Sequence, residues 1–402
     1  MAEETFKYQR KELELKALLE ITQAINENQS EAVLAEIFKF TCLVHLNIKS
    51  LILYVSKDGL FEQKIQHGVK GDPPFSIMPD EVLVDEESGE MRIEAAEEYS
   101  FGDLEVNLPV YHKDKILAIL LLSRKNKEEG LDLDFTQALS NILVVALENK
   151  RFARKQLEQE VVNREISIAS RVQQMLFPAE LPYGERLKAQ VTYFPFRQVG
   201  GDYYDLIIKN ELVYFSVADV SGKGISAALL MSNFQATLRT LLRSKASMKT
   251  ILHQLNYTLF ENTQGERFIT FFLGCYNRAN KTLTYGNAGH NPPLLCLPGE
   301  EECRELNAGT TILGAFEELP FLEIETIEDV DEFYMHLYTD GVTEAVNPKE
   351  EEFGEERLKR LVSYYSDVEP KEFHGNFIQE VQSFTGFVPL RDDLTLLSIK
   401  VQ

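Results

Sequence analysis

The stretch that decides the fold is FPFRQVGGDYYDLIIKNELVYFSVADVSGKGISAALLM, residues 194–231. It holds two strand-like segments, each with an aspartate at its tip. Asp202 follows a pair of glycines, and Asp219 closely follows the apolar run 213–218. Because strand ends are rigid, carboxylates placed there can converge at little conformational cost. The stretch therefore predicts an acidic site at one edge of a sheet.

Two further acidic motifs lie downstream beside strand-like runs. They are YTDGVTEA, which contains Asp340, and RDDLTLL, which contains Asp392 and Asp393. Any one of these motifs alone is most often only a turn. Converged carboxylates raise each other's pKa unless a dication neutralises them, and hard oxygen ligands of this kind suit Mg²⁺ or Mn²⁺. Together the motifs predict a metal site.

The length and charge of the chain limit its organisation and its partners. With 402 residues it exceeds what one hydrophobic core usually organises, so two or more domains are expected. The 64 acidic and 41 basic residues give a net charge of -23, which argues against a nucleic acid or an anionic membrane as the main partner. A protein or a small molecule is the better expectation.

The cysteines and the apolar runs point to a compartment. No CxxC spacing occurs among Cys42, Cys275, Cys296 and Cys303, and no basic, apolar leader opens the chain. The longest apolar run, Ile116–Leu122, is far shorter than the roughly 20 residues of a membrane helix and predicts a buried strand. We expect reduced thiols in a cytoplasmic protein without membrane insertion.

The first part of the chain reads as helices followed by strand pairs around an irregular, acidic middle. The predicted elements are helices over residues 5–29 and 31–46, a hairpin of strands 50–55 and 60–65, and a strand pair 105–110 and 116–123. This layout resembles a GAF domain, a sensing module, over about residues 15–150. No motif there names a ligand, so a small molecule, a protein signal and a purely structural role all stay open.

A long helix is predicted over residues 134–177, which contain neither proline nor glycine until Pro178 ends the run. Val161, Ile168 and Met175 are spaced seven apart, although Arg164 interrupts a strict seam. Two interpretations stay open. The helix is either a solvated connection, or a dimerising coiled-coil linker that carries a signal from a sensor to an effector.

The last part of the chain alternates strand-like runs with two helical stretches, 226–244 and 248–262. The further predicted strands are 268–276, 282–285, 294–297, 333–338 and 394–401. Many strands with few helices favour a β-sandwich with helices packed outside it.

Five motifs in a fixed order carry a family resemblance. They are VGGDYYD from Val199, ADVSGKG from Ala218, GNAGHNP from Gly286, YTDGVTEA from Tyr338 and RDDLTLL from Arg391, preceded by IASRVQQMLFP from Ile168. The set resembles the bacterial PP2C-like serine/threonine phosphatases of the SpoIIE and RsbU type, over about residues 160–402. The predicted fold class is α+β: a GAF-like α/β sensor (1–150), a helical linker (151–180) and a PP2C-like β-sandwich flanked by helices (181–402).

The resemblance implies a catalytic site with two Mn²⁺ or Mg²⁺ ions. Carried over by position, Asp219 would bridge the ions, and Asp202 and the Val220 carbonyl would serve one of them. Asp340 and Asp392 would hold the other ion, with Asp393 as the alternative to Asp392. His290, in the GNAGHNP motif, is interpreted as a hydrogen bonder that stabilises a turn.

The resemblance also implies a reaction and its partners. Two dications lower the pKa of a bridging water and neutralise phosphate oxygens, which suits hydrolysis of a phosphoserine or phosphothreonine. The implied substrate is a phosphorylated regulatory protein, typically an anti-sigma-factor antagonist. The apolar spacing of the linker helix, where it forms a coiled coil, predicts a homodimer through that helix. The helix that follows Asp219 would act as a switch. No arginine matches the phosphate-holding arginine of the eukaryotic branch, and Arg197 is not an established equivalent.

Two other functions compete with this one. Gly200–Tyr204 superficially resembles the GGDEF signature of diguanylate cyclases, but that family needs an acid where Tyr203 stands. The second alternative is a catalytically silent module with the phosphatase fold that binds a partner protein. The presence of all four candidate ligands argues against it.

Overall fold

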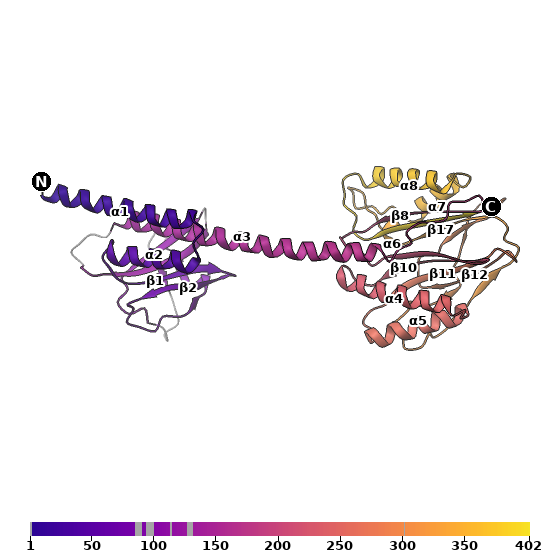
Figure 1. Cartoon of the computed structure of the whole chain (residues 1–402), viewed down its shortest axis with the longest axis horizontal. Helices are drawn as coiled ribbons and strands as arrows, with labels where there is room; N and C mark the ends of the chain where they lie inside the picture. The colour runs from indigo at the N-terminus through magenta and orange to yellow at the C-terminus, as the bar shows by residue number, and fades with distance from the viewer. Residues whose placement is uncertain (1, 85–90, 94–99, 113–114, 127–131, 301) are drawn as a thin grey trace. The chain divides into compact units, whose positions relative to one another are not determined.

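The computed structural model describes residues 2–84, 91–93, 100–112, 115–126, 132–300 and 302–402. The chain forms two compact units, Met1–Glu160 and Val161–Gln402, which are shown in Figure 1 and described one at a time below. Since the division falls inside one long helix, the domain limits at residues 150 and 180 stay predictions.

The N-terminal unit combines helices with a five-stranded sheet. α1 (Ala2–Asn26) and α2 (Glu31–Val44) confirm the two expected helices, and the Ser30 hydroxyl caps α2 by accepting a hydrogen bond from the Val33 N–H. The sheet has the order β3-β2-β1-β7-β6, formed by β1 (Ile48–Lys57), β2 (Leu60–His67), β3 (Ser76–Ile77), β6 (Val106–His112) and β7 (Lys115–Arg124). Both expected strand pairs are antiparallel neighbours in it.

Apolar side chains fill both faces of this sheet. One face packs with α1, α2 and the first part of the long helix, through residues such as Phe38, Leu53 and Leu143. The other face has a smaller cluster that includes Tyr54 and Ile119. Part of the irregular middle, residues 85–90 and 94–99, lies outside the described residues; the rest contains η1 (Pro79–Glu81) and the ribbon of β4 (Val82–Val84) and β5 (Met91–Ile93). The GAF assignment stays a prediction.

The long helix α3 spans Leu133–Gln174, close to its expected limits. Its first turns are buried in the N-terminal unit, whereas its later apolar side chains are exposed, among them Leu157, Val161, Ile168 and Val172. The helix closes with a tight turn in which the Met175 N–H donates to the Val172 carbonyl, just before Pro178. An exposed apolar stripe on a long helix is what a coiled coil requires, but both interpretations of this helix remain open.

The C-terminal unit is a sandwich of two mostly antiparallel sheets. The first has the order β15-β12-β11-β10-β9, with β16 beside β12, and its strands are β9 (Tyr203–Lys209), β10 (Leu212–Val220), β11 (Ile269–Asn277), β12 (Thr282–Ala288), β15 (Gly309–Thr310) and β16 (Glu325–Ile327). The second has the order β14-β13-β17-β18-β8, with β8 (Leu187–Phe194), β13 (Leu294–Cys296), β14 (Arg304–Glu305), β17 (Phe333–Tyr338) and β18 (Leu394–Val401). The predicted β-sandwich is confirmed.

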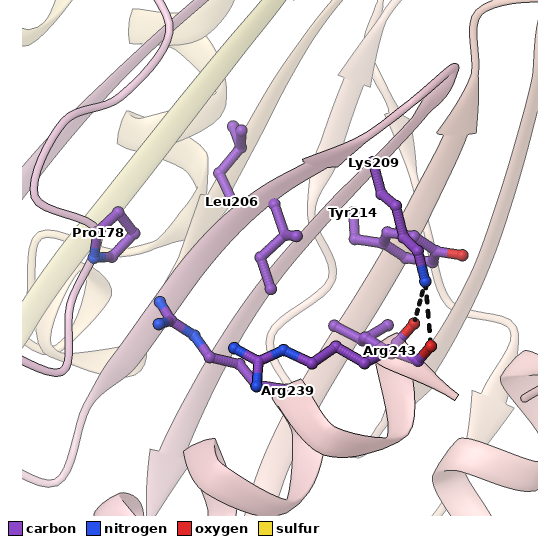
Figure 2. A pocket seen from close by; sticks show the side chains of 8 residues that line it. Pro178, Leu206, Lys209, Tyr214, Arg239 and Arg243 are labelled. Atoms are coloured by element: carbon purple, nitrogen blue, oxygen red, sulfur yellow. Dashed lines mark hydrogen bonds between the residues drawn. The ribbon is translucent and has the colours of Figure 1, made fainter. Parts of the chain in front are cut away.

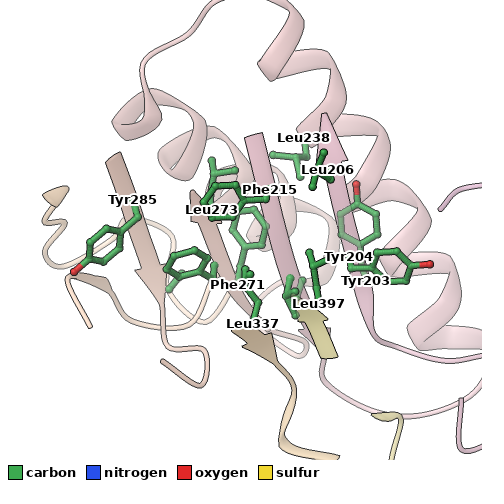
Figure 3. Close-up of a cluster of buried hydrophobic side chains, with 14 of the residues drawn as sticks. Tyr203, Tyr204, Leu206, Phe215, Leu238, Phe271, Leu273, Tyr285, Leu337 and Leu397 are labelled. Atoms are coloured by element: carbon green, nitrogen blue, oxygen red, sulfur yellow. The ribbon is translucent and has the colours of Figure 1, made fainter. Parts of the chain in front are cut away.

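Helices cover both outer faces of the sandwich. Figure 1 shows α4 (Ile225–Arg243) and α5 (Met248–Thr263) on one side, and α7 (Glu355–Tyr364) and α8 (Pro370–Thr385) on the other. The main core fills the space between the sheets and continues to α4 and α5, and Figure 3 shows part of it around Phe215 and Phe271. The Phe215 ring stacks on Phe272, and Phe271 packs edge-on against Phe234 of α4. Since strand side chains alternate between faces, Asp219 points to the same inter-sheet space as Phe215 and Val217.

Three features differ from the sequence analysis or complete it. Helices α7 and α8 were not expected, although Pro370 opens α8 and Gly386 ends it, both of which are ordinary helix boundary signals. Cys296 and Cys303 form a disulfide, so the expectation of four reduced thiols is wrong, whereas Cys42 and Cys275 are free. Among the described helices, none combines the length and the apolar character needed to cross a membrane.

Candidate metal centre

Asp219 is the second-last residue of β10, and its side chain faces the space between the two sheets. Burial, followed by repulsion from Asp340 and Asp392, raises the pKa of its carboxyl to about 7. A carboxylate whose neighbours are also carboxylates is unfavourable unless a cation joins them. The position thus has the charge environment expected of a bridging metal ligand.

Asp202 lies just before β9 and is 1% exposed. One oxygen, Oδ2, accepts hydrogen bonds from the hydroxyls of Thr339, at 2.7 Å, and Thr395. Burial and the charge of Asp219 raise the pKa of Asp202 well above its ordinary value. The two threonines come from the end of β17 and the start of β18, so the second sheet fixes a carboxylate that lies just before β9 of the first sheet. Neither threonine was predicted from the sequence.

The glycines before Asp202 allow a close approach of backbone and carboxylate. A Cβ on Gly201 would lie 2.9 Å from the Val220 carbonyl oxygen, and one on Gly200 would lie 2.5 Å from Asp393 Oδ2. Both distances are shorter than side chains tolerate. The Gly-Gly pair therefore brings Asp202 beside the Val220 carbonyl, the two groups that the resemblance assigns to one ion.

The neighbouring residues Asp392 and Asp393 have different surroundings. Asp393 is 6% exposed, and its carboxylate accepts the backbone N–H groups of Phe196 at 2.7 Å and Gly201 at 2.6 Å. Its oxygens are thus occupied in holding residues 196–202, which contain Gly200 and Gly201 and are called the glycine loop below. Asp392 instead pairs with the ammonium of Lys223 at 2.6 Å and keeps a side chain that is 30% exposed. This contrast favours Asp392 as the ligand and Asp393 as the residue that positions the loop.

Asp340 is the first residue of the short helix α6 (Asp340–Thr343). Burial, then the charge of Asp392, raises the pKa of its carboxyl. A Cβ on the next residue, Gly341, would lie only 1.9 Å from the Asp393 carbonyl oxygen, so glycine is needed where the two acidic motifs meet. Glu344 lies near the same acids: burial and then Asp340 raise its pKa. Glu344 was not among the residues predicted for the site.

The acidic side chains are close enough to interact but do not form a closed ligand set. Within the described residues, no three His, Cys, Asp or Glu side chains meet closely enough to hold a metal ion. Repulsion and competing partners explain this, because Lys223 holds Asp392 and two threonines hold Asp202. The donor set nevertheless fits a hard dication: it is all oxygen, largely buried, and poorly neutralised by protein cations.

The other sequence-predicted residues lie as follows. Val220 is buried, 1% exposed, and ends β10. His290 is buried, and its ring Nδ1 lies 2.8 Å from the hydroxyl of Thr270 on β11, so the ring is a hydrogen bonder as predicted. The turn itself is closed by the Asn287 side chain, which accepts the backbone N–H of His290 at 2.8 Å. Arg197 is exposed beside the glycine loop.

Residues at the end of α3 contact the glycine loop directly, a feature that no sequence signal revealed. Gln173 donates to the Gly200 carbonyl at 2.7 Å and accepts the Gly200 N–H at 3.2 Å. Three residues later, the Leu176 carbonyl accepts a hydrogen bond from Gln235 of α4 at 3.1 Å. Phe177 stacks on Tyr204 of β9, with the ring centroids 4.8 Å apart. The last turn of α3 is therefore joined both to the acidic site and to α4.

A salt bridge and a pocket lie farther along α4. Arg239 binds the buried Asp205 through two hydrogen bonds of 2.8 and 3.1 Å, and Asp205 follows Asp202 by three residues. Figure 2 shows the adjacent pocket of about 270 Å³, where Arg239 and Arg243 lie near Lys209, whose ammonium donates to carbonyls at the end of α4. The strand that follows Asp202 is thus tied to the C-terminal half of α4.

Comparisons with known proteins concern the C-terminal unit. Residues 209–402 match the family model described as Stage II sporulation protein E (SpoIIE). Phosphoserine phosphatase RsbU of Bacillus subtilis is 29% identical over 243 residues, which cover 60% of this chain and 71% of that protein. Protein IcfG of Synechocystis sp. is 27% identical over 283 residues, covering 60% of this chain and 43% of that protein.

A solved structure gives the same fold. The SiaA-PP2C domain of Pseudomonas aeruginosa superposes with a TM-score of 0.54 and 20% identity, covering 61% of this chain and 99% of that domain. At this identity the likeness establishes the fold of the unit, a PP2C-like sandwich. The matched family model lies wholly inside the C-terminal unit. It therefore does not test the GAF-like assignment of residues 1–150, which stays a prediction.

Proposed function

We propose, from the premise that the C-terminal unit is a PP2C-like protein phosphatase domain of the SpoIIE family, that this phosphatase dephosphorylates serine or threonine on a regulatory protein under control of the N-terminal unit. The observation that carries the proposal is the cluster of half-buried carboxylates around Asp219, with the buried Asp202 beside them and the pKa of Asp219 raised to about 7. The cyclase alternative is wrong, because Gly200–Tyr204 belongs to a PP2C-like fold.

The ligand assignments follow from where each group lies. Asp219, Asp202 and the Val220 carbonyl would hold one Mn²⁺ or Mg²⁺, and Asp219, Asp340 and Asp392 a second. Such ions supply, when bound, a nucleophile at neutral pH and neutralisation of phosphate charge. Asp393 would position the glycine loop, and the threonines that bind Asp202 would orient its carboxylate.

The substrate class follows from charge and from the relatives. The net charge of -23 disfavours nucleic acid, which leaves a protein or small molecule as the substrate. One relative is named a phosphoserine phosphatase, which favours phosphoserine here. We propose that the substrate is a phosphorylated anti-sigma-factor antagonist in a cytoplasmic signalling pathway.

Control would pass through α3. Its exposed stripe, which includes Leu157, Val161 and Ile168, would pair with the same helix of a second copy and form a homodimeric coiled coil. Its last turn holds Gly200 through Gln173, so a shift of the helix changes the position of the loop that carries Asp202. A small-molecule or protein signal at the GAF-like unit would act through this contact.

The test is phosphate release from p-nitrophenyl phosphate and from a phosphoserine peptide, with and without Mn²⁺ or Mg²⁺. The intact chain is compared with Asp219→Asn and Asp340→Asn, and with the exposed, distant Asp367→Asn as a control. Metal-dependent activity that is lost in the first two variants and kept in the control supports the proposal. An intact chain that binds Mn²⁺ but releases no phosphate would instead favour a silent binding module.

The dimer is tested separately by sedimentation of the intact chain and of Ile168→Asp. A charged side chain in an apolar seam opposes association, so the variant should sediment as a monomer at concentrations where the intact chain is a dimer. An intact chain that is monomeric at all concentrations would leave α3 as a solvated connection.

A further inference from the structure

An apolar groove lies against the outer face of the second sheet, at the C-terminal end of α8. It encloses about 260 Å³ and is lined by apolar groups of α8, β8 and the segment that follows α8, including Phe194, Ile378, Val381, Val388 and Leu394. Two of these residues connect the groove to the acidic site, since Leu394 follows Asp393 directly and pairs with Phe194 across the sheet.

The groove and the candidate metal centre share one short strand end. Side chains alternate along β18, so Leu394 faces α8 whereas Thr395 faces the inter-sheet space and binds Asp202. In the segment that follows the neighbouring strand β8, Phe196 lies two residues beyond Phe194 and donates its N–H to the Asp393 carboxylate. The segment 386–393 therefore forms the path from the mouth of the groove to the acids.

Aromatic side chains are exposed along this path. Phe387, in the segment after α8, is 104% exposed, and Phe194 and Phe196 are 43% and 39% exposed. Phe194 lines the groove itself, and Phe387 directly precedes the lining residue Val388. Exposed apolar side chains beside an apolar groove mark an interaction surface.

The charges beside the groove select the kind of partner. The ammonium of Lys223 and the guanidinium of Arg197 lie 5.2 and 5.7 Å from the centroid of the Phe196 ring. Among the described residues, no carboxylate lies within 4 Å of the Arg197 guanidinium, so its charge is available. Because Lys223 is already paired with Asp392, the free positive charge beside Phe196 comes from Arg197. A free cation close to the candidate catalytic site complements the phosphate of a phosphorylated protein, whose chain would then pass the groove.

We propose that this groove, which we call the α8 groove, docks an apolar side chain of the phosphoprotein substrate close to its phosphoserine. The inference rests on the proposed phosphatase function and extends it to substrate selection. An extended peptide spans about 3.3 Å per residue, so a side chain roughly two to five residues from the phosphoserine reaches from the acids to the groove. The groove would thereby restrict the enzyme to phosphoserines that have an apolar neighbour at this distance.

The experiment uses the intact chain and two sets of synthetic phosphoserine peptides. One set carries leucine at successive positions on either side of the phosphoserine, and the matched set carries serine there. The variants are Phe387→Ser and Ile378→Asn, and the control is Tyr364→Ser, which removes a side chain that is 80% exposed on α7, away from the groove. Metal-dependent phosphate release from p-nitrophenyl phosphate is measured in parallel.

We expect one or two leucine positions to raise kcat/KM about tenfold over serine, through KM, as the burial of one apolar side chain allows. Both groove variants should lose this preference and keep their activity on p-nitrophenyl phosphate within about twofold of the intact chain. The Tyr364→Ser control should keep both the leucine preference and the activity. Equal losses on peptide and on aryl phosphate would overturn the proposal, because they would indicate a damaged catalytic site. The absence of any leucine preference in the intact chain would overturn it as well.

Binding provides a readout that does not depend on turnover. Fluorescence anisotropy of the labelled leucine and serine peptides is measured with Asp340→Asn and with the same chain carrying Phe387→Ser. Weaker binding of the leucine peptide in the double variant supports the groove even if no phosphate release is found. If the intact chain releases no phosphate but Asp340→Asn binds the leucine peptide selectively, the proposed function is wrong and the docking surface stands. If Asp340→Asn binds the leucine and serine peptides equally, the docking surface is wrong.

Discussion

Asp219→Asn should make the metal-free protein more stable at neutral pH while it abolishes catalysis. Burial and the nearby carboxylates raise the pKa of Asp219 from 3.8 to about 7. The unfolded chain loses this proton near pH 3.8, whereas the folded chain keeps it until about pH 7. The folded state thus binds more protons in between, and its stability falls as the pH rises through that window.

The size of the effect follows from the shift. Each pKa unit corresponds to about 1.4 kcal/mol, so a shift of roughly three units costs the folded state about 4 kcal/mol above pH 7. Asparagine has a similar shape and no charge, so the variant escapes this cost. The advantage of the variant should be about 4 kcal/mol at pH 8, smaller at pH 6, and close to nothing at pH 4.

Differential scanning calorimetry of the intact chain in a chelator measures this advantage. For a unit of this size, about 4 kcal/mol corresponds to a rise in Tm of roughly 10 °C at pH 8. Mn²⁺ should reverse the order, because it binds the folded wild type more tightly than the variant. The exposed Asp367→Asn serves as the control and should follow the wild type. Equal Tm values for wild type and Asp219→Asn at pH 8 without metal would refute the reasoning.

Three further predictions address the rest of the site. Asp392→Asn should weaken Mn²⁺ binding, measured by calorimetric titration, more than Asp393→Asn does. Asp393→Asn should mainly lower Tm, because it weakens the contacts that hold the glycine loop. The reverse order of Mn²⁺ affinities would make Asp393 the ligand. Gln173→Ala, which leaves the buried Gly200 groups unpaired, should lower stability by about 1–3 kcal/mol and change the Mn²⁺ concentration for half-maximal activity, whereas the exposed Gln174→Ala should do neither. Burial lowers the pKa of His374 to about 3, so the unfolded chain takes up this proton near pH 6.5 and the folded chain does not. The stability due to this neutral ring is therefore lost as the pH falls below 6.5, by about 3 kcal/mol at pH 4.5, and the loss should be smaller in His374→Gln.

The sequence predicted the parts of the fold that local pattern controls. The alternation and length of apolar runs located β10, β17 and β18, and the ordered motifs pointed to Asp202, Asp219 and Asp340 at the ends of strands or just beside them. Helices α7 and α8 were missed although signals for them are present, since 355–385 is amphipathic and Pro370 and Gly386 mark the ends of α8. The disulfide between Cys296 and Cys303 was missed because only the return of the chain from β13 to β14 brings them together.

The contacts that define the site could not be read from the sequence, because they join residues far apart in it. Thr339 and Thr395 lie more than 130 residues from the Asp202 carboxylate that they bind. Gln173 is one of two consecutive glutamines, and only the direction of the last helical turn selects it over Gln174. Sequence pattern identifies which side chains can carry the chemistry, whereas tertiary packing decides which of their oxygens remain free for it.

In the proposed function, the balance of charges at the site would link metal binding to control by the linker helix. Without a dication, the repulsion around Asp219 opposes a closed ligand set, and the Lys223 ammonium offsets only part of it through Asp392. A bound dication would supply the missing positive charge. The position of Asp202 relative to that ion depends on Gly200, which Gln173 holds from the end of α3. If the proposed control through α3 operates, a displacement of this helix would change the free energy of assembling the ligands, and metal affinity would be the quantity that a signal from the N-terminal unit regulates.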